Sequence, residues 1–161
     1  MKKIFTSFIL LFCLVNIGFI PLLQAQASPL PYSQDFNTGN DFTLTNYTYP
    51  NKWNYGSAAG NTGNSIYISN DDGLTNNYTI LNNPSVVHAI KELTIPAGTT
   101  AASPAILQFD WRAGGESSFD YLKVWLVPAS YTPNNQLIPT GGGRIQVGGN
   151  LNLLQGTGWQ S

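Results

Sequence analysis

The stretch Leu107–Pro128, LQFDWRAGGESSFDYLKVWLVP, decides the expected fold, because apolar and polar side chains alternate in two separate parts of it. In its first part Leu107, Phe109 and Trp111 share one face of an extended chain, and polar residues occupy the other face. A period of two with aromatic residues is typical of a half-buried antiparallel strand. The pattern therefore predicts a strand over residues 107–112.

The alternation returns after a polar loop, Ala113–Asp120, which is too long for a two-residue hairpin turn. Apolar and mixed rows then oppose each other, with Leu122, Val124 and Leu126 against Tyr121, Lys123, Trp125 and Val127. We expect a second strand here, with the apolar row in a two-layer core. The other row should face solvent or a partner.

Shorter alternating runs surround this stretch, at Asp41–Tyr47, Ser65–Asn70, Ser85–Ile95 (with an irregularity midway) and Arg144–Val147. Dense turn signals separate them, at residues 37–40, 59–64, 71–73, 96–98 and 141–143. Many short strands at such spacing predict an all-β, antiparallel jelly-roll sandwich. A β-helix, the alternative, would need a short internal repeat, which the sequence lacks.

The first 27 residues have the organisation of a signal peptide. Lys2 and Lys3 precede an apolar run to about Leu23, and Ala25-Gln26-Ala27 provides a cleavage site. A retained membrane anchor is the alternative, because the run is nearly long enough to span a bilayer. Cleavage predicts an exported chain that starts near Ser28, is secreted or held at the cell surface, and has no transmembrane segment.

Charge and cysteine content exclude several classes of function for residues 28–161. The sole cysteine, Cys13, falls in the signal peptide, which excludes disulfides and thiol chemistry from the mature chain. Without Lys2 and Lys3, five basic side chains oppose eight acidic ones, a net charge of about −3. Nucleic-acid binding therefore has no electrostatic basis.

Several motifs resemble a known family. They are Phe109-Asp110-Trp111-Arg112, Gly115-Glu116, Asp120–Val124, Pro31–Phe36, Trp53 and Ser65–Gly73. Together they resemble the MAM-like jelly-roll domains of secreted Bacteroidetes proteins, described as choice-of-anchor or cleaved-adhesin domains, over about Leu30–Trp159. The resemblance implies surface attachment and further strands, so we expect residues 28–161 to form a domain that is incomplete at its C-terminus.

The resemblance also implies a structural Ca²⁺ near the first strand, at Asp35 and Asn37. Asp110, Glu116 and Asp120 are further candidate ligands around the central loop. Calcium takes about six to eight oxygen ligands, and glycine-rich loops let carbonyls contribute. The alternatives are that these are solvated loop acids, or that Asp110 pairs with Arg112 or Lys123 across strands.

A candidate ligand-binding face carries Tyr121 and Trp125 beside Lys123 and Arg112. Rings on the exposed face of a sheet can stack against the C–H surface of a sugar while polar neighbours bond its hydroxyls. The alternative is that another strand or domain buries the rings.

Catalytic motifs are absent from the sequence. His88 has no serine motif near it, and the paired carboxylates of jelly-roll glycosidases are missing. The sequence therefore predicts a non-catalytic recognition or adhesion module that binds a glycan or an extracellular protein. The alternatives are an accessory domain of a secreted hydrolase and a structural spacer.

Overall fold

The computed structural model describes residues 27–116 and 118–161, so the predicted signal peptide lies outside the described residues except for Ala27. Eight strands are present: β1 (Ser28–Pro29), β2 (Thr43–Thr45), β3 (Lys52–Gly56), β4 (Ser65–Ser69), β5 (His88–Ile90), β6 (Leu93–Thr94), β7 (Tyr121–Leu126) and β8 (Ile145–Asn152). The helical structure in the described ranges is one 3₁₀ turn, η1 (Leu153–Gln155). The predicted all-β class is confirmed.

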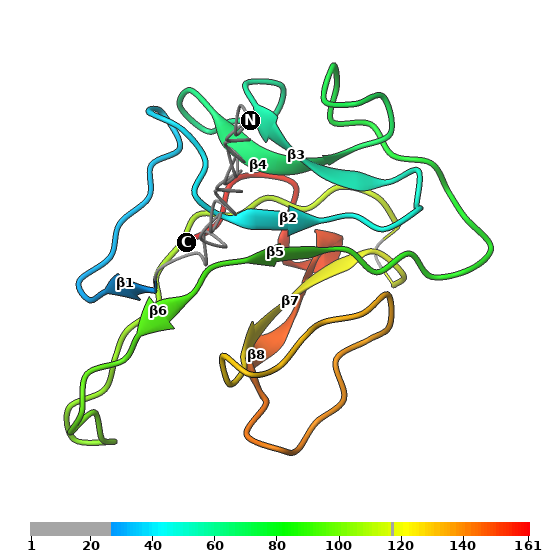
Figure 1. Ribbon diagram of the computed structural model, residues 1–161. Helices are drawn as coiled ribbons and strands as arrows, with labels where there is room; N and C mark the ends of the chain where they lie inside the picture. Colours follow the sequence, from blue (N-terminus) through cyan, green and yellow to red (C-terminus); the bar gives the residue numbers. More distant parts are fainter. Residues whose placement is uncertain (1–26, 117) are drawn as a thin grey trace, which may run out of the picture.

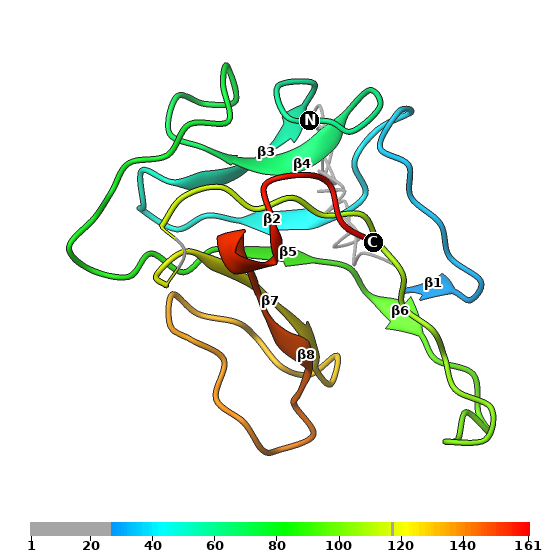
Figure 2. The ribbon, with the colours of Figure 1, turned by 180° about the vertical axis from the view of Figure 1, so that it is seen from behind.

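The strands form four pairs, shown in Figures 1 and 2. β2 with β5, β3 with β4 and β7 with β8 are antiparallel, whereas the short β1–β6 pair is parallel. In both views β2–β5 lies beneath β3–β4, and β7–β8 crosses below them at an angle. This arrangement of short antiparallel pairs is compatible with a β-sandwich.

A side-chain amide joins β2 to β3 where a backbone ladder is missing. Asn46 Nδ2 donates to the Trp53 carbonyl at 2.9 Å, and the Trp53 N–H donates to Asn46 Oδ1 at 2.7 Å. A side-chain amide has the same donor and acceptor groups as a peptide group, so the Asn46 side chain pairs with the backbone of Trp53 as a residue of a neighbouring strand would. The pairs β2–β5 and β3–β4 are thereby connected.

The most buried part of the described chain is a hydrogen-bonded polar cluster around Ser69, at the end of β4. Of the residues that the structure describes, Asn51, Tyr67 and Ser69 are the buried ones, and Ser69 is completely enclosed. The Ser69 hydroxyl donates to Asp71 Oδ1 at 2.6 Å and accepts the N–H groups of Asp71 and Gly73.

The loop beyond this cluster is tied back to the sheet. The Tyr67 hydroxyl donates to the Gly73 carbonyl, and the amide of Asn51 exchanges two hydrogen bonds with the backbone of Thr79. Asp72 and Gly73 both have positive φ, which an L-residue adopts mainly in tight turns. The turn predicted from Asp71-Asp72-Gly73 is therefore present.

The prediction of a strand over residues 107–112 is wrong, because this segment forms no strand ladder and does not pair with β7. Trp111 forms one isolated antiparallel bridge with Gln160. Exposure alternates from residue 108 on, with Phe109 and Trp111 half-buried and Gln108, Asp110 and Arg112 exposed, but Leu107, predicted to share the buried face, is 57 % exposed. The periodicity thus identified an extended chain, but β8 supplies the hydrogen-bond partners of β7.

A bulge in β8 interrupts the regular pairing of β7 with β8. Between the pairs Leu122↔Leu151 and Val124↔Val147, β7 has one residue and β8 has three, Gly148-Gly149-Asn150. Bulges increase the local twist of a strand pair. Beyond the bulge the apolar row is uncovered, with Leu126 51 % and Ile145 58 % exposed, which corrects the prediction that the whole row faces a core.

The other strand boundaries differ from expectation in simple ways. The run Ser65–Asn70 is confirmed as β4, and Ser85–Ile95 contains β5 and β6 with a break between them. Asp41–Tyr47 supplies only the three residues of β2, because Tyr47 has positive φ and leaves the strand. β8 runs past Val147 to Asn152 because its glycines form the bulge instead of ending the strand, and β3 was not predicted.

We predict that Asn46→Ala destabilises the protein by about 1–3 kcal/mol, because it leaves the half-buried Trp53 N–H and carbonyl without partners. Urea unfolding monitored by tryptophan fluorescence measures the loss. The same substitution at the exposed Asn82 is the matched control and should change the free energy of unfolding by less than about 0.5 kcal/mol. Equal losses at both positions would contradict the role assigned to Asn46.

Candidate functional site

The start of β7 carries the most site-like group of the predicted side chains. Lys123 Nζ lies 5.0 Å from the centroid of the Tyr121 ring, so the two residues share one side of the strand. Tyr121 is 38 % exposed, while Lys123 and Trp125 are half-buried. A cation over an aromatic ring is attracted by the quadrupole of the ring, and this holds both groups in place.

The predicted face divides at the bulge. Tyr121 opposes Asn152 on β8, whereas Trp125 opposes Gln146 beyond the bulge. Arg112 is placed in a different contact, with its guanidinium carbon 5.4 Å from the centroid of the Trp159 ring. The structure therefore brings together Tyr121 and Lys123 of the predicted ligand-binding residues, and no described contact joins Arg112 to them.

Glu116 and Asp120 are brought together in a closed turn before β7. The Glu116 N–H donates to Asp120 Oδ2 at 2.8 Å, and the Glu116 carbonyl accepts the N–H groups of Phe119 and Asp120. The Tyr78 hydroxyl also contacts Asp120: burial and the hydrogen bond to this carboxylate raise the pKa of Tyr78. The Asp120 carboxylate is thus occupied by donors from the protein.

The remaining predicted calcium ligands lie in other contacts. Asp35 Oδ1 accepts the N–H of Asn37 at 3.0 Å, which closes a local turn. Asp110 accepts the Ser161 hydroxyl on one oxygen and approaches the Asn61 amide with the other. Within residues 27–116 and 118–161, no three His, Cys, Asp or Glu side chains gather as a metal-binding group. Asn37 lies against Gly63 and Asp110 against Asn61, so these two predicted ligands approach the same loop. Glu116 and Asp120 contact each other in the turn before β7.

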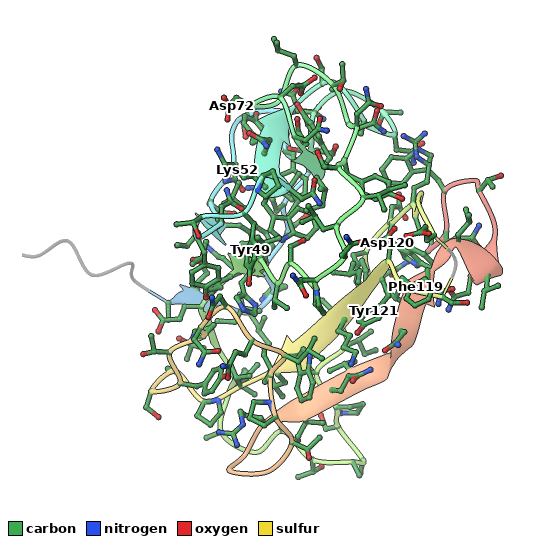
Figure 3. The ribbon with its side chains drawn as sticks, turned by 90° about the vertical axis from the view of Figure 1, so that its right-hand side faces the viewer. Tyr49, Lys52, Asp72, Phe119, Asp120 and Tyr121 are labelled. Carbon is green, nitrogen blue, oxygen red and sulfur yellow. The ribbon has the colours of Figure 1, made fainter. Side chains whose placement is uncertain are left out.

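Phe119 is a surface residue that the sequence analysis missed. It is 75 % exposed and precedes Tyr121 by two positions in the sequence. Figure 3 labels Phe119, Asp120 and Tyr121 beside one another at the start of β7. The alternation that identified Tyr121 extends to Phe119 in the same phase, so this signal was available in the sequence. It was overlooked because Phe119 belongs to the polar loop.

The only histidine has a structural environment. One nitrogen of the His88 ring lies 2.9 Å from the Asn134 carbonyl, and the ring packs edge-on to Tyr47 with centroids 6.0 Å apart. These contacts hold the loop that follows β7 against β5.

A second charged cluster fixes the segment after β1. Asp41 accepts hydrogen bonds from Tyr32 at 2.6 Å, Gln34 at 2.8 Å and Lys91 at 2.8 Å. Partial burial opposes ionisation, but the three hydrogen bonds prevail and lower the pKa of Asp41 to about 2. Partial burial and the Asp41 carboxylate raise the pKa of Tyr32. Lys91 Nζ also lies 4.9 Å from the centroid of the Tyr32 ring.

No family model, curated protein or solved structure matches this chain. In the part of the chain that the structure describes, no helix has the length and apolar character needed to cross a membrane.

We predict that stability falls as the pH drops from about 4 towards 2. Hydrogen bonds from Ser69 and Thr75 lower the pKa of Asp71 to about 2, and that of Asp41 is similarly low. The unfolded carboxyls titrate near 4, so the unfolded chain binds these protons first and acid favours it. Urea unfolding at several pH values should give a steeper loss for the wild type than for Asp41→Asn/Asp71→Asn. Parallel pH profiles would contradict the two assignments.

The calcium hypothesis has a direct test. Because no three acidic, cysteine or histidine side chains gather among the described residues, we expect the same melting temperature in excess Ca²⁺ and in excess chelator. A bound ion would stabilise the folded state by mass action, so a melting temperature that rises with Ca²⁺ concentration would show a calcium site and contradict this expectation.

Proposed function

We propose that this chain is an exported, non-catalytic recognition or adhesion module built on a jelly-roll sandwich. The all-β architecture with short antiparallel pairs supports the fold part of the proposal. The resemblance to MAM-like and choice-of-anchor domains supports the extracellular part. In this proposal the sandwich is a rigid platform in a larger secreted or surface protein.

The observation that carries the proposal is the Tyr121–Lys123 pair at the start of β7. The ring is partly exposed, and the ammonium over it is positioned to donate hydrogen bonds beside it. Aromatic anchors with a polar neighbour are typical of binding hot spots. A sugar would stack on the free side of the ring, and a protein partner would bury it.

Two other functions are consistent with the same fold. An accessory domain of a secreted hydrolase would use the same face to hold the substrate of a separate catalytic domain, and a spacer would bind nothing. Binding by the isolated module separates the spacer from the other two. Hydrolysis of a bound glycan by the complete native protein separates the accessory domain from the adhesin.

We predict that a glycan array and a panel of matrix proteins contain a ligand whose affinity Tyr121→Ala weakens about thirtyfold. This factor corresponds to about 2 kcal/mol, which is typical of an aromatic anchor. Tyr131→Ala is the matched control, because Arg144 lies over the Tyr131 ring at 5.2 Å on a different segment. Equal losses in both variants, or no ligand for the wild type, would contradict the proposed site.

A further inference from the structure

Lys123 has no carboxylate partner in the part of the chain that the structure describes. All eight acidic residues of the sequence lie in that part, and the ion pairs found there use Lys52 and Lys91. The described contact of the Lys123 ammonium is the ring of Tyr121. Because Lys123 is half-buried and has no carboxylate beside it, its charge is available to an anion from outside the protein.

The accessibility of the neighbouring ring distinguishes Lys123 from the two arginines that also lie near rings. Arg112 is beside Trp159 and Arg144 is beside Tyr131, and both of these rings are half-buried. Tyr121, at 38 %, is the most exposed ring of the three. At the start of β7 a ligand can therefore reach apolar ring surface and an ammonium without a carboxylate partner at the same time.

The acids near this pair limit the charge that a ligand can carry. The Asp120 carboxylate accepts the Glu116 N–H and a hydrogen bond from Tyr78, and the Glu116 side chain is exposed. Both carboxylates repel a ligand with many closely spaced negative charges, such as a sulfated polymer. A single carboxylate directed at Lys123 instead gains a charge-assisted hydrogen bond.

We propose that the ligand of the Tyr121–Lys123 pair is an acidic glycan. A uronic acid unit places its C–H surface against the Tyr121 ring and its carboxylate on the Lys123 ammonium. The ammonium has three donors on a flexible stem, so it can bond an oxygen at the rim of the ring. This inference rests on the proposed recognition function and names the class of its ligand.

A sugar acid suits this pair better than an acidic peptide does. In a uronic acid the apolar surface and the carboxylate belong to one rigid ring, so both contacts form when a single unit is ordered. In a peptide they belong to two flexible side chains, and fixing both costs more conformational entropy.

The test compares uronic acid oligosaccharides with the same oligosaccharides after reduction of their carboxyl groups. Isothermal titration calorimetry on the secreted chain should show at least one acid, among oligogalacturonates and oligoglucuronates, that binds about tenfold more tightly than its reduced counterpart. Added salt should weaken this preference. Lys123→Gln should remove the preference and leave affinity for the reduced oligosaccharide unchanged, and Lys123→Arg should keep most of it.

Lys52→Gln is the matched control, because it removes the same charge from the exposed ion pair with Asp72. Figure 3 shows Lys52 and Asp72 apart from Tyr121. This variant should prefer the acidic oligosaccharides as strongly as the wild type does.

Four results would overturn the proposal. They are equal affinities within every acid and reduced pair, a preference that survives Lys123→Gln, an equal loss in Lys52→Gln, and an oligoglutamate peptide that binds as tightly as the acidic oligosaccharides. Neutral glycan binding that Tyr121→Ala weakens would then leave the proposed recognition function standing. If no glycan and no matrix protein binds, that function fails as well.

Discussion

The structure depends on side chains that complete the hydrogen bonding of strands too short to do so themselves. β1, β2, β5 and β6 have two or three residues each, so their ladders satisfy few backbone groups. The Asn46 side chain connects β2 to β3, and the Asn51 side chain pairs with the backbone of Thr79. The Ser69 hydroxyl accepts the N–H groups of Asp71 and Gly73, which have no strand partner. An amide or hydroxyl buried in this way is costly to remove because the groups it satisfies remain.

The charged side chains are likewise held in specific contacts. In the ranges that the structure describes, each of the five basic side chains has a specific contact. Lys52 pairs with Asp72 at 3.2 Å, Lys91 pairs with Asp41, and the side chains of Lys91, Arg112, Lys123 and Arg144 each lie near an aromatic ring. Rings therefore replace carboxylates as partners for most cations, which suits a chain with few charges and many aromatic residues. The surface consequently presents ring–cation pairs instead of a charged patch.

Alternation in the sequence predicted the all-β class and the positions of β4, β5, β6 and β7, because period two is a local property of extended chain. It could not predict pairing, because Trp111 bridges Gln160 and β7 pairs with β8 through contacts distant in sequence. β3 was missed although Trp53 and Tyr55 alternate with Lys52, Asn54 and Gly56, so the signal for this strand was present in the sequence. For the candidate site, alternation placed Tyr121 and Lys123 on one side correctly. It could not show that Glu116 and Asp120 close a turn, since a period of two carries no information on a bond such as that from the Glu116 N–H to Asp120 Oδ2.

The glycine bulge in β8 explains why the candidate site lies at one end of β7 instead of along its length. A regular pair would keep Tyr121, Lys123 and Trp125 on one exposed face, as alternation alone predicts. Three residues of β8 oppose one of β7 at the bulge, and beyond it Trp125 is half-buried while Leu126 and Ile145 are exposed. The exposed aromatic side chains of β7 and of the turn before it are thus Tyr121 and Phe119. Beyond the bulge the exposed large side chains are the aliphatic Leu126 and Ile145, so the character of the surface changes along the strand pair.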